Sequence, residues 1–310
     1  MASVMTSAMK SFIGRHTDKA FDWNAFPRSS GHPELGRAQM RYIGAGGSPR
    51  VDDPDTLKPE HFTLSILNLP AGHYGASHLH DDCEETFLGL EGGLLTVGWG
   101  WGDEVIETLL GPKDMMLLPV DRPHAYRNDS TEAARFAISV GSGKPNLPTY
   151  VAHPTQSDRA RQFGAAPGKT YRYSPRSDDP RQLDFGSHLI RYAERPVHWH
   201  PAGFGWMAYV GEGGAPAGNF REDLVHVPRG KGVRLYERSV EDAYMVLEGV
   251  LTVGWDVEGR VVEERLGPKD AIFNPAGRLH YFRNDGFHDA QFMMIIGTPA
   301  SEDVDFEPAD

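Results

Sequence analysis

Short apolar runs separated by glycine, proline, asparagine and aspartate make up most of the chain. Examples are FTLSILNL at 62–69, MMLLPV at 115–120, ARFAISVG at 134–141 and QFMMIIGT at 291–298. Runs of this length, bounded by turn-forming residues, are typical of β-strands. No stretch keeps the apolar periodicity of an amphipathic helix. The pattern therefore predicts an all-β protein made of antiparallel sandwiches or barrels.

The same strand pattern occurs twice along the chain. LEGGLLTVGW at 90–99 returns as LEGVLTVGW at 247–255, and LLGPKD at 109–114 returns as RLGPKD at 265–270. PVDRPHAYRND at 119–129 also matches PAGRLHYFRND at 275–285. A repeat this long is a duplicated domain and not a solenoid unit, because solenoid and propeller repeats span only about 20–50 residues.

The duplication divides the chain into five parts. We expect one barrel at 36–142 and a second at 186–298, joined by a linker at 143–185 that is rich in proline, glycine, serine and charge. An N-terminal arm occupies 1–35, and residues 299–310 form an acidic tail.

Four aromatic residues of the arm have no counterpart in the repeat: Phe12, Phe21, Trp23 and Phe26. Large apolar side chains need a surface to cover them. We therefore expect the arm to pack on the other barrel or on a neighbouring chain, and we expect a homo-oligomer.

Composition narrows the class of protein. A hydrophobic share of 39% and a charged share of 24% describe an ordinary globular protein. The net charge of -12, without a cluster of Lys and Arg, argues against a nucleic-acid partner. No apolar run approaches the ~20 residues of a membrane span, and the first residues lack the apolar core of a signal peptide. The single cysteine, Cys83, fits a cytoplasmic protein, and we expect it to fill space near the site described next.

The segment HLHDDCEETFLGLEG at 78–92 is the strongest candidate for chemistry. His78 and His80 are two residues apart, so on a strand they project to one face. Glu85 follows after a turn, and His124 lies behind a later proline-marked turn. Imidazoles with one carboxylate suit a borderline divalent ion such as Fe(II), Mn(II), Ni(II), Cu(II) or Zn(II). The alternative, a polar cluster in a dry core, would leave too many polar atoms unpaired.

Strand alternation extends the site. Phe87 shares a face with Glu85, and Tyr126 and Asn128 share a face with His124. We expect these three residues to line the cavity around the ion, although Phe87 and Tyr126 can equally be core residues.

The second copy departs from this pattern. An alignment without gaps places Leu235 and Glu237 opposite the two histidines, Asp242 opposite the glutamate and His280 opposite the last histidine. We expect the second barrel to have lost this type of site. Glu237, Asp242 and His280 remain able to hold another ion or to form a hydrogen-bonded network. The pair in HWH at 198–200 lies too far from Asp242 to be its partner and is expected to be exposed.

The first copy resembles the first motif of the cupin family. Gly72, His78, His80, Glu85 and Gly92 stand at the spacing of that motif without a gap.

The later segment resembles the second cupin motif. Pro119, His124 and Asn128 match it, whereas Lys113 and Asp121 stand where glycines are usual. With the duplication, the chain is identified as a bicupin. The resemblance implies two tandem double-stranded β-helix (jelly-roll) barrels, with one metal ion in the first barrel held by four residues: His78, His80, Glu85 and His124.

One intact half beside one degenerate half resembles ring-cleaving dioxygenases of the gentisate and quercetinase types. Oxalate decarboxylases, by contrast, generally keep ligands in both halves. The main hypothesis is an Fe(II) dioxygenase acting on a small aromatic or enolic substrate that chelates the metal. The alternatives are a redox-neutral isomerase or decarboxylase using Mn, Ni or Zn, and a bicupin that binds a ligand without catalysis. No catalytic acid or base is assigned.

Overall fold

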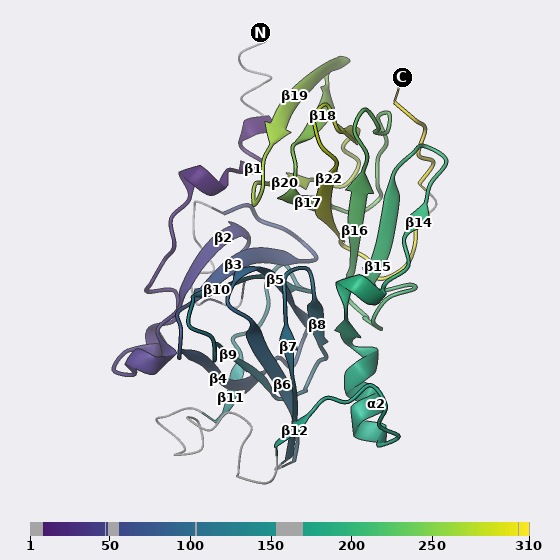
Figure 1. Cartoon of the computed structure of the whole chain (residues 1–310). Helices are drawn as coiled ribbons and strands as arrows, with labels where there is room; N and C mark the ends of the chain where they lie inside the picture. Colours follow the sequence, from purple (N-terminus) through teal and green to yellow (C-terminus); the bar gives the residue numbers. More distant parts are fainter. Residues whose placement is uncertain are drawn as a thin grey trace. The chain divides into compact units, whose positions relative to one another are not determined.

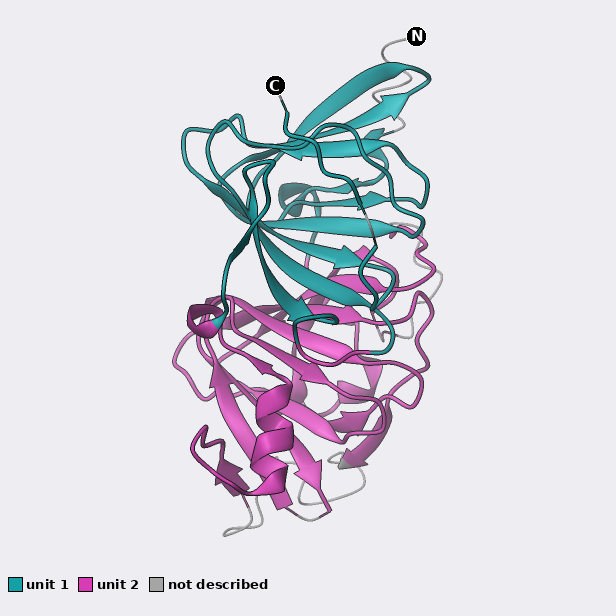
Figure 2. Cartoon of the chain, turned by 90° about the vertical axis from the view of Figure 1, so that its right-hand side faces the viewer, with its two compact units in different colours: residues 1–20, 195–214, 218–310 teal, residues 21–194, 215–217 magenta. Residues whose placement is uncertain are grey.

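The structure is a computed structural model that describes residues 9–46, 48, 56–102, 104–152, 170–302 and 304–309. The chain forms two compact units (Figure 2). One contains residues 21–194 and 215–217, and the other contains 1–20, 195–214 and 218–310. None of the described helices is long and apolar enough to cross a membrane.

The first unit is a barrel of two sheets, with strand orders β13-β8-β5-β10-β3-β2 and β11-β4-β9-β6-β7-β12 (Figure 1). Strands β3 to β10 pass back and forth between the two sheets, which is jelly-roll connectivity. The strands are β2 (Ala38–Ile43), β3 (Thr63–Leu69), β4 (Tyr74–Leu79), β5 (Glu85–Gly92), β6 (Leu95–Trp101), β7 (Glu104–Leu110), β8 (Met115–Leu118), β9 (His124–Arg127), β10 (Ala134–Val140), β11 (Thr149–Ala152), β12 (Thr170–Arg172) and β13 (Leu189–Ile190).

Alternate residues of these strands fill the interior of the barrel. Phe87, Val97 and Phe136 are completely buried and belong to one apolar cluster. Burying such side chains contributes about 1.5–3 kcal/mol each, which makes this cluster the main source of the barrel's stability.

Much of the segment expected to be a linker belongs to the first unit. Strands β11 and β12 extend one of its sheets, and helix α2 (Pro180–Ser187) follows. Phe185 of α2 is completely buried and lies edge-on to Trp99, with ring centroids 5.1 Å apart. The strands escape a sequence search because they are short and carry no apolar alternation, so only their hydrogen bonds define them.

The second unit repeats the architecture, with strand orders β1-β20-β17-β22-β16-β15-β14 and β19-β18-β21. Both predicted jelly-roll barrels are therefore confirmed. The strands are β1 (Ile13–Gly14), β14 (His198–Trp199), β15 (Gly205–Val210), β16 (Arg221–Val227), β17 (Asp242–Glu248), β18 (Leu251–Val257), β19 (Arg260–Leu266), β20 (Ala271–Asn274), β21 (His280–Arg283) and β22 (Ala290–Ile296).

The arm divides between the two units. Residues 13–14 form β1 and pair with β20, and the Phe12 ring packs on Trp255 with centroids 5.0 Å apart. Phe26 belongs to the first unit, and Trp23 remains 57% exposed. The start of the arm thus packs on the second barrel.

Candidate metal centre

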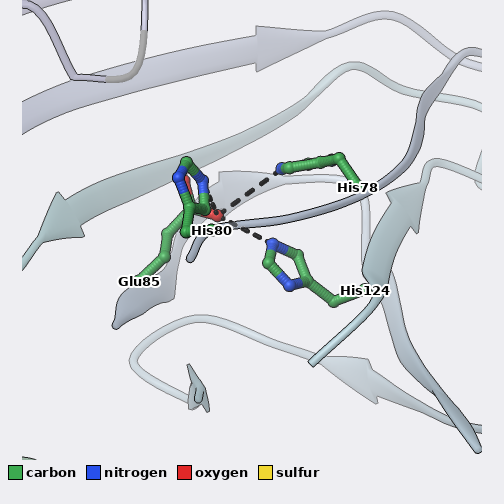
Figure 3. Close-up of side chains that lie close together, drawn as sticks. All are labelled: His78, His80, Glu85 and His124. Carbon is green, nitrogen blue, oxygen red and sulfur yellow. Dashed lines mark hydrogen bonds and ion pairs between the residues drawn. The ribbon is translucent and has the colours of Figure 1, made fainter. Parts of the chain in front are cut away.

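Four polar side chains converge inside the first barrel, and they come from both of its sheets (Figure 3). His78 lies in β4 directly across from His124, the first residue of β9. His80 follows the end of β4, and Glu85 is the first residue of β5 in the opposite sheet. The turn between His80 and Glu85 carries the chain from one sheet to the other. The cluster therefore exists only when the barrel is folded.

The histidines surround one oxygen of the glutamate. Glu85 Oε2 lies 3.0 Å from His124 Nε2, 3.6 Å from His80 Nε2 and 3.8 Å from His78 Nε2. All four residues are buried, and their candidate ligand atoms lie within 4.8 Å of one another. The fold thus brings all four residues predicted as metal ligands together at one place in the first barrel.

Backbone carbonyls orient two of the imidazoles. His78 Nδ1 lies 2.8 Å from the oxygen of Ala76, and His124 Nδ1 lies 2.8 Å from the oxygen of Arg122. A ring that donates its Nδ1 proton to a carbonyl presents the Nε2 lone pair on the opposite side. Such contacts are the usual second support of a metal-binding histidine.

The electrostatics of the cluster favour neutral imidazole beside carboxylate. Burial and the nearby His124 together lower the pKa of His78 to about 4, although its contact with Glu85 acts in the opposite direction. For Glu85, burial opposes ionisation, but hydrogen bonds with His124, His78 and His80 hold the pKa well below its usual range. His80 is the exception, because hydrogen bonding to Glu85 and the charges of Glu85, Asp82 and Asp81 outweigh burial and raise its pKa.

These residues fit a divalent metal ion. Three imidazole nitrogens and one carboxylate oxygen suit borderline ions such as Mn(II), Fe(II), Ni(II) and Zn(II). His124 Nε2 is within hydrogen-bonding distance of Glu85 Oε2, whereas the Nε2 atoms of His80 and His78 lie 3.6 and 3.8 Å from the same oxygen, too far for good hydrogen bonds. Four ligands also leave coordination positions open for a further molecule.

A cavity of about 280 Å³ opens onto three of the four residues, His78, His80 and Glu85. It lies at the lower end of ordinary ligand sites, which span about 300–1,000 Å³. Its other lining residues are Phe26, Pro27, Arg28, Arg37, Gly46, Tyr126, Ile138, Leu147, Pro148 and Tyr150. The wall is largely apolar, with two arginines and two phenols.

Of the three residues expected to line the cavity, Tyr126 does so. Phe87 is completely buried behind it, with its ring centroid 5.1 Å from that of Tyr126. Asn128 instead donates hydrogen bonds to the carbonyls of Leu69 and Glu132 and ties the end of β9 to neighbouring loops. Strand alternation correctly predicted that Phe87 and Asn128 are buried inside the barrel, but it could not predict that they lie behind the wall of the cavity.

The sequence search missed the other wall residues, including Arg28, Arg37 and Tyr150. They lie outside the cupin motifs: Arg28 in the arm, Arg37 at the start of the expected first barrel and Tyr150 in the segment expected to be a linker. For Arg37, the feature that marks it is its burial just before a strand. Burial cannot be inferred from the segment GRAQM at 36–40, so the sequence carries no signal for this residue.

The acidic turn beside the cluster is structural. Asp82 accepts the backbone N–H of Asn146 at 2.8 Å and the Cys83 thiol at 3.2 Å. Burial raises the pKa of the Cys83 thiol, so this cysteine stays protonated and unreactive. Cys83 is part of the apolar cluster of the barrel, as expected for a filler.

Comparison with known proteins agrees with this arrangement. Residues 65–141, which include all four converging residues, match the cupin domain family. Oxalate decarboxylase from Lactobacillus farciminis, solved as a formate complex, has a TM-score of 0.65 at 12% identity, covering 96% of this chain and 88% of that chain. The first barrel thus carries a cupin domain, and the chain as a whole has a two-barrel bicupin fold.

A second structure similar to this bicupin is oxalate decarboxylase from Bacillus subtilis, in a study of its Mn(II) centres. It has a TM-score of 0.64 at 13% identity and covers 96% of this chain and 79% of that chain. No curated protein matches the sequence. Identities this low show a shared fold and leave the activity to be argued from the site.

The second barrel of the bicupin holds a guanidinium where the first has its cluster. Arg238 Nε donates to Asp242 Oδ2 at 3.0 Å, and His280 Nε2 lies 3.2 Å from the same oxygen. Asn274 donates to the other oxygen of Asp242 at 2.7 Å. As expected, the described residues of the second barrel lack the cluster of three histidines and one glutamate. In its place is a buried network in which Arg238 supplies the positive charge.

The gap-free alignment placed the wrong residues in this network. Tyr236 pairs with His280 as His78 pairs with His124, so Tyr236 and Arg238 occupy the histidine positions. Glu237 points away and is exposed. The second copy has one residue fewer between this segment and Asp242, which reverses which side chains face inward.

The HWH segment does not join that network. His198 and Trp199 are exposed in β14, as expected, while His200 stacks on Phe204 with centroids 5.0 Å apart. Within the part of the chain that the structure describes, a second group of potential metal ligands consists of His80, Asp82 and Cys83, and it also lies in the first barrel.

Proposed function

We propose that this bicupin is a metal-dependent enzyme that catalyses a redox-neutral reaction, decarboxylation or isomerisation, on a small substrate with oxygen donors. The observation that supports it is the buried cluster of three histidines and one glutamate at a small cavity with a phenol in its wall. His78, His80, Glu85 and His124 would hold one divalent ion, which supplies Lewis acidity to a substrate oxygen when bound.

Tyr126 is the proposed proton donor. It lines the cavity and shares its strand with His124. Burial raises the pKa of Tyr126 to about 12 in spite of the nearby Arg37 charge, so the phenol keeps its proton at neutral pH. A protonated phenol beside a substrate oxygen or carbanion can donate a hydrogen bond or the proton itself.

The named structural neighbours favour this proposal over the ring-cleaving dioxygenase expected from the sequence. They are oxalate decarboxylases, one of them described with Mn(II) centres. Their support is limited to the reaction type and to Mn(II) as the first metal to test.

Metal content tests the site. Purified wild-type protein should hold about one divalent ion per chain, measured by elemental analysis. His80→Ala should lose it, because one of four ligands is gone, and His280→Ala should retain it, because that histidine belongs to the arginine network. Equal metal in all three proteins would contradict the assignment.

Turnover with and without oxygen tests the reaction type. We expect the Mn(II)-loaded protein to convert a member of a panel of small hydroxy and keto acids at the same rate in air and under anaerobic conditions. Tyr126→Phe should lower kcat by about 10²-fold or more, while metal content stays unchanged. Stoichiometric oxygen consumption would establish the dioxygenase instead, and thermal stabilisation by a ligand without turnover would establish a binding protein.

A further inference from the structure

Among the residues that the structure describes, Arg37 is a buried cation without a carboxylate partner. The residue directly precedes β2, is 5% exposed and lines the cavity of the metal centre. Its Nη1 donates to the carbonyl oxygen of Leu35 at 3.0 Å and to Ser29 Oγ at 3.1 Å. Its Nε is buried and has no acceptor. Among the described residues, no carboxylate oxygen lies within 4.0 Å of this guanidinium.

Other arginines with little exposed side chain are paired with acids in the described part of the chain. The buried Arg238 contacts Asp242 and Glu302, each at 3.0 Å, and the partly buried Arg41 contacts Asp22 at 3.2 Å. Taking an arginine out of water is costly unless an opposite charge and hydrogen bonds replace its hydration. Arg37 therefore differs from these arginines: its guanidinium is buried, and its hydrogen-bond acceptors among the described residues are neutral.

The aromatic rings around Arg37 offset only part of the free-energy cost of burying its charge. Its guanidinium carbon lies 3.9 Å from the centre of the Phe26 ring and 6.0 Å from the centre of the Tyr126 ring. Cation–π contact stabilises the charge and holds the plane of the guanidinium in place. A ring face accepts no N–H in the guanidinium plane, and among the described residues neither the buried Nε nor Nη2, which share one edge of the group, has a hydrogen-bond acceptor.

The chemistry of that edge selects the ligand. A guanidinium whose faces are stacked on aromatic rings and whose edge is free is suited to a planar anion bound through parallel N–H···O bonds. The cavity is too small for a large ligand, and the same space opens onto His78, His80 and Glu85. Arg28 is exposed at the cavity and adds a second positive charge in a chain whose net charge is -12.

We propose that Arg37 is the carboxylate-binding residue of the cavity. This inference rests on the proposed function and narrows its substrate class to small carboxylic acids with a second oxygen donor. The carboxylate binds the guanidinium edge, and the second donor, a hydroxyl, a ketone or another carboxylate, is directed towards the metal centre. Tyr126 lines the same cavity, with its ring centre 6.0 Å from the Arg37 guanidinium carbon and in the same strand as His124, and would be near the bond that joins these groups.

A purely structural role for Arg37 is the competing account, because Leu35 and Ser29 precede β2 and are held by its Nη1. The two accounts differ in whether carboxylates bind in the absence of metal. Arg37→Gln can still donate to those neighbours but carries no charge. Arg37→Met removes both the charge and the donors.

The experiment is calorimetric titration of metal-free protein, stripped with a chelator, with acetate, lactate and benzoate and with the three corresponding amides. Wild type should bind at least one of the acids and none of the amides. Binding should weaken about tenfold or more in both Arg37→Gln and Arg37→Met, the loss typical of a hydrogen bond to a charged group. Arg135→Met is the matched control, since Arg135 also lies over an aromatic ring, that of Phe21, but lies outside the cavity.

Three outcomes would overturn the proposal. They are binding of acids and amides alike, equal binding by the Arg37 variants and wild type, and no binding of any acid by wild type. Binding of inorganic phosphate in preference to all the acids would also overturn the carboxylate assignment. Metal content of the Arg37 variants separates this inference from the proposed function: retention of about one ion per chain leaves the metal centre intact whatever the acids do.

Discussion

Gly75 shows how a single residue sets the shape of the cavity. It pairs with Tyr126 across β4 and β9, and a Cβ added there would lie 2.3 Å from Cζ of the tyrosine ring. The ring cannot retreat, because Phe87 and Phe136 pack on it with centroids 5.1 and 5.2 Å away. The missing side chain of the glycine is therefore what lets the phenol stand beside the metal centre.

Gly75→Ala should lower the free energy of unfolding by about 1–3 kcal/mol through overpacking. It should also weaken the binding of the cavity probes, because the tyrosine ring is displaced. Chemical denaturation and the acid titration described above measure the two effects. Gly111→Ala is the control, since its added Cβ would meet nothing closer than 3.7 Å. Equal stability of the two variants would show that the barrel absorbs the clash.

At this scale, the sequence predicted the four converging residues because strand parity and motif spacing are local properties. His78 and His80 face one way on any strand, and their spacing from Glu85 needs only a turn. Arg37 could not be found in this way. Its importance comes from burial and from the absence of a partner, and both depend on segments far away in the sequence.

Among the described elements, β1 is one of the two-residue strands, and it has a clear structural role. It brings Phe12 to the second barrel, where the ring packs between Trp255 and Phe273, with centroids 5.0 and 6.3 Å away. Arg15, just after β1, forms ion pairs with Glu264 and Asp270 at 2.8 and 3.0 Å. The two residues of β1 are thus held in place by the flanking side chains of Phe12 and Arg15.

Phe12→Ala should lower the free energy of unfolding by about 2 kcal/mol, because Phe12 is only partly buried and loses less than a fully buried phenylalanine. Trp23→Ala, in the same arm but at a side chain that is 57% exposed, should change it by less than about 0.5 kcal/mol. Thermal or denaturant unfolding compares the two. A larger effect at Trp23 would mean that the tryptophan is covered in solution, as in contact with a neighbouring chain.

The sequence was a better guide to the existence of strands than to their exact register. The repeated LTVGW and GPKD segments marked equivalent strands in both barrels. The counterpart of β4 in the second barrel is reduced to isolated bridges at Gly232 and Tyr236. The second copy lacks one residue between this segment and Asp242, so side chains that face inward in the first barrel align with side chains that face outward in the second. An alignment without gaps cannot detect this change.

For the molecule as a whole, the duplication has produced two barrels with different kinds of buried charge. In the second, Asp242 is completely enclosed by Arg238, His280 and Asn274. Although burial opposes ionisation, its contacts with His280 and Arg238 keep its pKa below the usual range, so the carboxylate stays charged. Asp242 depends on this pairing, because its side chain has no exposed surface, whereas Arg238 also pairs with Glu302 at 3.0 Å.

Arg238→Met should therefore destabilise the protein by about 3–5 kcal/mol, the cost of leaving a buried carboxylate unpaired. Adding Asp242→Asn should recover part of that loss, which gives a coupling of about 1 kcal/mol or more in a double-mutant cycle. Arg229→Met, at an exposed arginine of the same unit that lies over Phe287, should have little effect. Strict additivity of the two core changes would argue against the pairing.

The guanidinium of Arg238 is joined to the chain by covalent bonds, whereas an ion among His78, His80, Glu85 and His124 has to be acquired from solution. The second barrel is thus complete as soon as the chain has folded, and no chelator can remove its central charge. The first barrel reaches its final state only when the surroundings provide the ion. Two halves descended from one ancestor therefore differ in what they require from the cell: one needs only its own synthesis, and the other also depends on the local supply of a trace element.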